Sequence, residues 1–153
     1  MFTVVDISTV SIVIASAGVF AAAIYYIVQI RHQTKLRQTD LIIRLYSFVA
    51  SKEFCEAWEK FDDREITDLG TYKKKYGFVE FNQVVTVFDE IGVLLHKKLV
   101  EISVIDAIFH EHVIVTWEKM KPIIGEVRRV YGTHQLAEFE YLYNEMKKRE
   151  QQQ

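Results

Sequence analysis

The first thirty residues form an almost uninterrupted apolar stretch, with no charged residue between Ile7 and Ile30. The few polar side chains within it are Ser8, Thr9, Ser11, Ser16 and Gln29. As an α-helix rising about 1.5 Å per residue, this stretch spans ~36 Å, which is enough to cross a hydrocarbon layer of ~30 Å with some tilt. The pattern therefore predicts a transmembrane helix over residues 7–30.

The apolar stretch has two other interpretations. A buried helix of a soluble protein is usually shorter and more often interrupted. A cleaved signal peptide is suggested by Ala15-Ser16-Ala17, which resembles a cleavage site. However, no basic residue precedes the stretch, and apolar residues from Ile24 to Val28 continue well past that site. We therefore expect the segment to remain attached as an anchor.

The charges that flank the apolar stretch predict its orientation. Arg31, Lys35 and Arg37 follow it closely, whereas Asp6 precedes it. Because Lys and Arg are retained on the cytoplasmic side, residues 1–6 are expected outside the cell membrane and the rest of the chain inside. The three basic side chains are expected to contact anionic lipid headgroups of the inner leaflet, each contributing about 1 kcal/mol.

The hydrophobic periodicity after the membrane segment is helical throughout. No Gly or Pro occurs between Gly18 and Gly70, so the membrane helix is expected to continue as a stalk over residues 31–50. Further helices are predicted over 52–62, 78–98, 103–131 and 134–149, and 63–77 is expected to be a loop that can include one helical turn around residues 72–76. The fold class is all-α: a transmembrane helix, a stalk and a cytoplasmic bundle of about four helices over 51–153.

Several residues predict local features of these helices. Ser51 is expected to cap the helix at 52, and Thr133 the one at 134. Ser103 and Asp106 have the spacing of a capping box. Pro122 is expected to kink or break its helix near residues 120–121. Gly92 interrupts a strong helical pattern at a cost of about 1 kcal/mol, which predicts close packing of another helix at that point.

Composition excludes some functional classes. All 19 basic residues and all but one of the 21 acidic residues follow the apolar stretch, so the remaining chain is nearly neutral and offers no electrostatic basis for binding nucleic acid. The only cysteine, Cys55, excludes a disulfide framework. Since it lies beside Phe54 and Trp58, Cys55 is expected in the core.

Several short motifs are similar to those of an uncharacterised prokaryotic family, described only as a domain of unknown function. They are Arg44-Leu45-Tyr46-Ser47, Glu53-Phe54, Phe88-Asp89-Glu90-Ile91-Gly92, Trp117-Glu118, Lys121-Pro122-Ile123-Ile124 and Arg128. The resemblance covers most of the chain. It implies one N-terminal membrane helix and a small cytoplasmic helical domain, without an assigned activity or catalytic residue.

A stripe of small residues follows one face of the predicted membrane helix. Its members are Ser8, Ser11, Ala15, Gly18 and Ala22, spaced three and four residues apart. Small residues allow helices to approach closely in lipid, and hydroxyl groups can bond across the contact. The same seven-residue frame continues through Tyr25, Gln29, His32, Leu36, Thr39, Ile43 and Tyr46, as a left-handed supercoil requires. We therefore predict a homo-oligomer with the stripe as its seam.

Two alternatives to this seam remain open. The helix can be a monomeric anchor, because small residues are common in membrane helices. It can also line an oligomeric ion channel, in which the stripe faces the pore, Asp6 forms an acidic ring at the outer mouth and Arg31 a basic ring inside. The absence of charge within the span favours packing over a wide aqueous pore.

The remaining candidate chemistry is weak. His110 and His112 are two residues apart, so on a helix they lie ~200° apart and cannot face one metal ion. His112 borders the apolar face and is expected to be a hydrogen-bonded core residue. Asp106 and His110 share a face, but no third ligand is evident. Neighbouring carboxylates such as Asp62 and Asp63 define no cleft. We predict no catalytic, cofactor or metal site. The expected function is an interaction or regulatory module, with a membrane-tethered enzyme as a further alternative.

Overall fold

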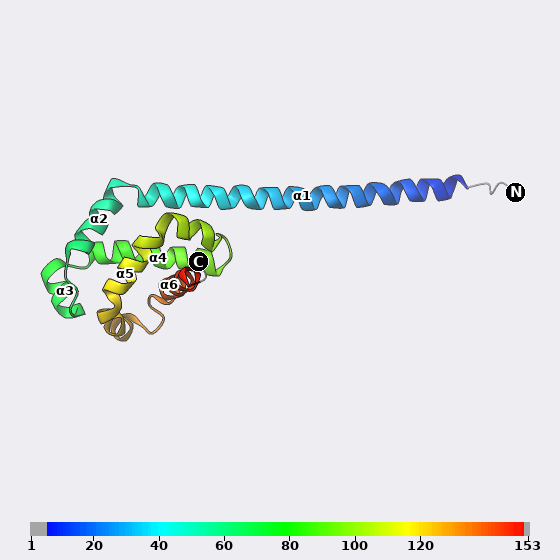
Figure 1. Cartoon of the computed structure of the whole chain (residues 1–153). Helices are drawn as coiled ribbons and strands as arrows, with labels where there is room; N and C mark the ends of the chain where they lie inside the picture. Colours follow the sequence, from blue (N-terminus) through cyan, green and yellow to red (C-terminus); the bar gives the residue numbers. More distant parts are fainter. Residues whose placement is uncertain (1–5, 152–153) are drawn as a thin grey trace. The chain divides into compact units, whose positions relative to one another are not determined.

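The computed structural model describes residues 6–151, and within this range all regular elements are α-helices (Figure 1). Of the predicted outer segment 1–6, only Asp6 lies among the described residues. The chain divides into two compact units, residues 1–40 and residues 41–153. The helices are α1 (Ile7–Val49), α2 (Lys52–Asp63), α3 (Leu69–Tyr76), α4 (Val79–His96), α5 (Ile102–Tyr131) and α6 (Ala137–Glu150).

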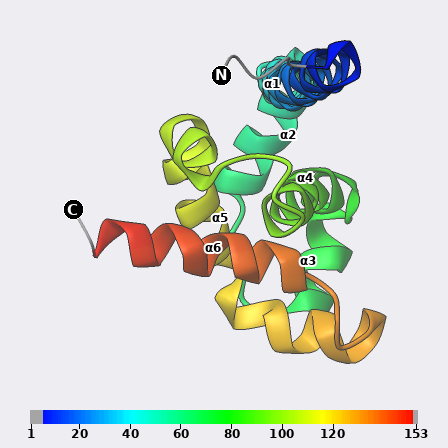
Figure 2. The ribbon, with the colours of Figure 1, turned by 90° about the vertical axis from the view of Figure 1, so that its right-hand side faces the viewer.

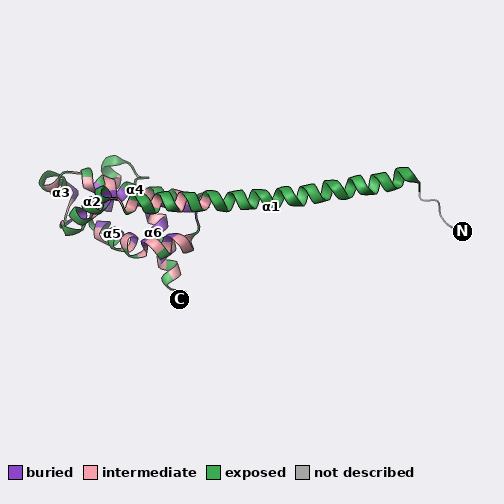
Figure 3. Ribbon diagram, turned by 90° about the horizontal axis from the view of Figure 1, so that it is seen from above, coloured by how far each residue is buried: buried purple, intermediate pink, exposed green. Residues whose placement is uncertain are grey.

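Helix α1 accounts for all the described residues of the first unit except Asp6. Its 43 residues run without interruption from the apolar segment to Val49, which confirms the predicted continuous helix. None of its residues is buried, and the apolar half is exposed along its whole length (Figure 3). The only helix breaker inside it is Gly18, which one helical position tolerates.

The second unit buries a core of aromatic and branched side chains contributed by α2 to α6. The last turns of α1 belong to this unit, and there Ile42, Leu45 and Val49 pack against the core. In α2, Ser51 accepts a hydrogen bond from the Phe54 amide at 3.3 Å, so the predicted cap is confirmed.

The prediction that residues 63–77 form a loop is wrong for half of that segment. Helix α3 begins after Asp68, whose carboxylate accepts from the Thr71 amide at 2.7 Å, and Glu126 of α5 accepts from the Leu69 amide at 2.9 Å. Gly77 ends the helix with a φ of 80°. Five helices therefore follow α1, not about four. The helix has only eight residues, too few for a clear apolar period, and part of its capping comes from α5.

Helix α6 runs across α4 (Figure 2). The two helices are in contact at Gly92, which is buried. A Cβ atom at this position would overlap the backbone carbonyl group of Glu138. The close helix packing predicted at Gly92 is therefore confirmed. Around the crossing, Phe88 stacks on Phe139 at 5.2 Å between ring centroids.

The start of α6 is capped from α4 and not by Thr133 as expected. The helix begins at Ala137, after Leu136 in the left-handed conformation, and residue 136 makes no side-chain cap. Instead, Asp89 accepts a hydrogen bond from the Phe139 amide at 2.9 Å. A carboxylate thus satisfies one of the unpaired amides at the helix start, where the helix dipole also favours negative charge.

Arg128 holds the turn between α5 and α6. Its guanidinium donates to the Gln135 carbonyl at 3.2 Å and pairs with Glu140 at 2.6 Å. Gly132, with a φ of 119°, ends α5 as the sequence predicted.

The capping box predicted at the start of α5 is wrong. The helix begins at Ile102 without a side-chain cap, and Ser103 bonds to Glu101, so no capping box with Asp106 forms. Pro122 lies inside the helix, so no break occurs near residues 120–121, whereas a kink at that point stays a prediction. Proline removes the hydrogen bond to the carbonyl four residues earlier, at Glu118, but both residues are exposed and water can bond to that carbonyl.

Replacing Gly92 by Ala is predicted to lower the free energy of unfolding of the helical domain by about 1–3 kcal/mol, because α4 and α6 must move apart. Gly125→Ala is the matched control: Gly125 is exposed within α5 and a Cβ there meets nothing, so the variant gains about 1 kcal/mol of helix propensity. Thermal unfolding followed by circular dichroism measures both. Equal effects of the two substitutions would contradict the close crossing.

Candidate functional site

The apolar half of α1 is the most unusual surface of the described chain. An 18-residue window of this helix has a mean hydropathy of 2.2, and none of it is buried. The helix meets the length and composition of a membrane span, near the N-terminus. Since the segment is not enclosed by the chain's own core, the interpretation as a buried soluble helix is not supported.

The predicted seam residues Ser8, Ser11, Ala15, Gly18 and Ala22 are all exposed. The Ser11 hydroxyl donates to the Ile7 carbonyl at 2.9 Å, and Ser8 donates to Asp6 at 2.7 Å. Both hydroxyl protons are therefore already donated to groups of the same chain, so neither serine has a free donor for a second helix in this conformation. A Cβ atom added to Gly18 meets nothing, so no contact within the chain accounts for a glycine there.

Charged residues flank the apolar segment at both ends. Asp6 precedes the first turn, and the Ser8 hydroxyl holds the pKa of its carboxyl group below the ordinary value. Arg31, Lys35 and Arg37 are exposed on α1 beyond the segment. An anionic group before an uncharged span and cations after it provide the charge asymmetry on which the predicted orientation depends.

A polar cluster joins α5 to the end of α6. The two ring nitrogens of His110 lie 2.6 Å from Asp106 and 2.9 Å from Glu150, and Arg149 pairs with Asp106 at 2.8 Å. Only the imidazolium form has two N–H donors for two carboxylates. Accordingly, the hydrogen bond to Asp106, and next that to Glu150, raises the pKa of His110.

This cluster is not arranged as a metal site. The two carboxylates bind opposite edges of the His110 ring and do not converge on one point. Among residues 6–151, no group of three His, Cys, Asp or Glu side chains is placed to hold a metal ion. Through these ion pairs, the cluster attaches the last turn of α6 to α5.

Two other sequence predictions about single residues are corrected. Cys55 is exposed on α2, with its sulfur 3.5 Å from the Val49 carbonyl, because Phe54 and Ala57 define the buried face instead. His112, expected as a hydrogen-bonded core residue, is half-buried with its ring 4.9 Å from that of Trp58.

The acidic pairs serve the fold. Asp62 pairs with Lys119 of α5 at 3.4 Å, and Asp89 caps α6 as described above.

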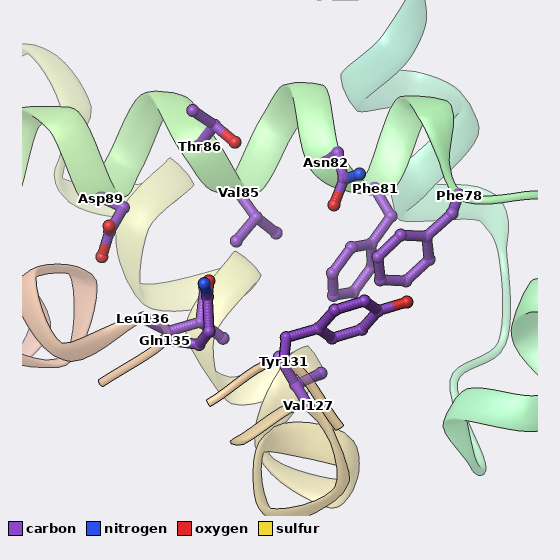
Figure 4. A pocket seen from close by; sticks show the side chains of 10 residues that line it. All are labelled: Phe78, Phe81, Asn82, Val85, Thr86, Asp89, Val127, Tyr131, Gln135 and Leu136. Carbon is purple, nitrogen blue, oxygen red and sulfur yellow. The ribbon is translucent and has the colours of Figure 1, made fainter. Parts of the chain in front are cut away.

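Sequence reasoning missed a cavity between α4 and the α5–α6 turn (Figure 4). Its volume is about 420 Å³. Its lining residues are Phe78, Phe81, Asn82, Val85, Thr86, Asp89, Val127, Tyr131, Gln135 and Leu136. They come from two segments about fifty positions apart, and no sequence motif joins these two segments, so only the folded chain brings them together.

These features define an all-α protein with one long, exposed apolar helix ahead of a compact helical domain. The chain belongs to the family described as a domain of unknown function (DUF4760), whose sequence profile matches residues 12–146. The resemblance to an uncharacterised family is thereby confirmed. No curated protein and no solved structure matches the chain.

The His110 cluster predicts a pH dependence of stability. Because the pKa of His110 is raised on folding, its stabilising contribution is complete below the ordinary histidine value near 6.5 and is lost as the pH rises through the raised pKa. The side chain is 37% exposed, so solvent screening limits the effect to less than about 1 kcal/mol. Unfolding of the wild type between pH 6 and 8.5 should therefore show a loss that His110→Gln lacks. Identical pH profiles would contradict this role.

Proposed function

We propose that the chain is a single-pass protein of the cell membrane, with residues 7–30 crossing the bilayer and the N-terminus outside. Residues 31–50 then form a stalk, and residues 51–153 form a cytoplasmic domain. In this proposal the protein self-associates along α1, and the domain acts as an interaction or regulatory module.

The observation that carries the proposal is the full exposure of the apolar half of α1. Exposed apolar surface of this extent is unfavourable in water, at about 25 cal/mol per Å². Soluble monomers rarely leave such patches uncovered. A lipid bilayer removes the surface from water and accommodates the backbone, since a helix satisfies its own hydrogen bonds.

The family match supports retention of this segment. It begins at residue 12, inside the apolar stretch, and continues to residue 146. The span is thus part of what members of the family share, together with the helical domain. A removable leader would more naturally precede the shared region.

Self-association is supported by residues beyond the predicted span. Leu36, Ile43 and Tyr46 continue the seven-residue frame of the small-residue stripe, and each is more than half exposed. At the end of α1, other positions of the helix, such as Ile42 and Leu45, pack against the domain core. A second copy of α1 would cover the exposed frame and extend the lipid-embedded seam into water.

An oligomeric ion channel is the alternative, motivated by the same stripe with Asp6 and Arg31 at its ends. Recordings from the reconstituted protein in planar bilayers distinguish the two. Silence under voltage, tension and pH steps supports packing without conduction, and discrete current steps support the channel.

The exposed Cys55 provides a native reporter of orientation, because it is the only cysteine of the chain. A membrane-impermeant maleimide should label it only after cells are permeabilised, since α2 is proposed to be cytoplasmic. In a Cys55→Ser background, Asp6→Cys should be labelled in intact cells. The opposite pattern would reverse the proposed orientation.

Self-association is tested by making the same substitution, alanine to isoleucine, separately at two neighbouring positions. Ala22→Ile enlarges the stripe and is predicted to reduce cross-linked dimers and higher species in membranes by about tenfold, because close packing is lost. Ala23→Ile makes the same change one position along, off the stripe, and should leave cross-linking intact. Only monomer in the wild type, or equal effects of both variants, would refute the seam.

A further inference from the structure

The cavity beside α4 has the dimensions of a small-molecule site. Its volume of about 420 Å³ falls within the usual range for ligand pockets, ~300–1,000 Å³. Its floor consists of the buried side chains of Phe81, Val85, Val127 and Leu136. Such a site combines an apolar floor with a few polar groups that orient the ligand.

One end of the cavity is aromatic. The rings of Phe78 and Phe81 stack with centroids 4.5 Å apart, and Phe78 stacks on Tyr131 at 5.8 Å. Figure 4 shows these three rings gathered at one end of the pocket. Tyr131 is 42% exposed, so its ring is accessible to a further planar group.

The other end of the cavity is anionic. Asp89 uses one carboxylate oxygen to accept from the Phe139 amide, and carboxylates have further lone pairs for a ligand. No Lys, Arg or His side chain lines the cavity, so this carboxylate sets the sign of its charge. A cationic donor therefore suits this end, and an anion does not.

A basic side chain outside the cavity fixes the direction in which a charged ligand would lie. The Lys73 ammonium is 3.3 Å from the Tyr131 hydroxyl and 5.8 Å from the centroid of the Phe78 ring. It would repel a ligand cation from the aromatic end. The cation is thereby directed to Asp89.

The spacing of the two ends along α4 sets the ligand's length. Asn82, beside the rings, and Asp89 are two helical turns apart, which corresponds to ~10 Å. Between them Thr86 is exposed, and across the cavity Gln135 is also exposed. Within residues 6–151, the side chains of Asn82, Thr86 and Gln135 make no hydrogen bond to another protein group, which leaves them accessible to a ligand or to water.

The backbone at the cavity wall is held in a costly conformation. Leu136 has a φ of 64° and is buried. A left-handed conformation costs a non-glycine residue about 1–2 kcal/mol, and such positions cluster where ligands bind. The surrounding bonds of Asp89 and Arg128 keep this turn in place without a ligand.

We propose that this cavity binds an arylalkylamine, a planar aromatic ring joined by a short aliphatic linker to an ammonium group. The ring lies against Tyr131 and Phe78, and the ammonium bonds to Asp89. The amides of Asn82 and Gln135 accommodate polar substituents between the two ends. A ligand in this position contacts both α4 and the turn that starts α6, so it stabilises their crossing.

The proposal is tested with two probes of matched shape and opposite charge, 4-phenylbutylamine and 5-phenylpentanoate, whose extended length of ~10 Å matches the spacing of the two ends. The full chain in detergent is titrated with each and followed by isothermal titration calorimetry and ligand-observed NMR. The amine should bind at least tenfold more tightly than the carboxylate. Equal binding of the two probes, or no binding of the amine, would overturn the proposal.

Two variants locate the binding. Thr86→Trp fills the cavity from an exposed position and should abolish amine binding, whereas Thr86→Ser should preserve it. Asp89→Asn retains an oxygen for the Phe139 amide but removes the charge, so it should reduce the preference for the amine to less than threefold. Undiminished binding by folded Thr86→Trp would place the probe elsewhere and refute the site.

Discussion

The exposed apolar half of α1 is incompatible with water, and the arrangement of the rest of the chain depends on this constraint. No part of residues 6–151 covers this surface, and the length of the apolar segment matches the thickness of a bilayer. If lipid covers this surface, the charge asymmetry between Asp6 and the basic residues from Arg31 onward determines on which side of the membrane the domain lies. The small-residue stripe likewise becomes relevant only in lipid, where close packing drives helix association.

Within the domain, the organising contact is the crossing of α4 and α6. Gly92 lets the backbones approach, and three residues earlier Asp89 caps α6 in place of a local side chain. Both residues belong to one of the motifs that carry the resemblance to the family. Arg128, which holds the turn between α5 and α6, also contributes to that resemblance. These motif residues therefore have structural roles. Asp89 also lines the cavity, so the stability of the crossing and the proposed ligand site share this residue.

Periodicity predicted the long helices well, because α1, α2 and α4 each present several turns of apolar side chains and their ends carry local signals such as Ser51. It failed where stabilisation is not local. The short α3 is capped partly by Glu126 of α5, and α6 starts three residues late because Asp89 of α4 supplies its cap. Cys55 was predicted to lie in the core because Phe54 and Trp58 are close to it in sequence. It is one position beyond the buried Phe54, however, and on a helix this step turns its side chain toward solvent. The cavity was not predicted, since its lining residues come from two segments that are distant in sequence and that no motif joins.

The most direct test of the central claim is alkaline carbonate extraction of membranes from cells that express the full chain, followed by detection of the protein in pellet and supernatant. A bilayer-crossing α1 predicts that the protein stays in the pellet. It also predicts that Ile14→Arg combined with Val19→Arg releases it, since each charge at the centre of the span costs about 2.5–3.5 kcal/mol. Wild-type protein in the supernatant would contradict the account.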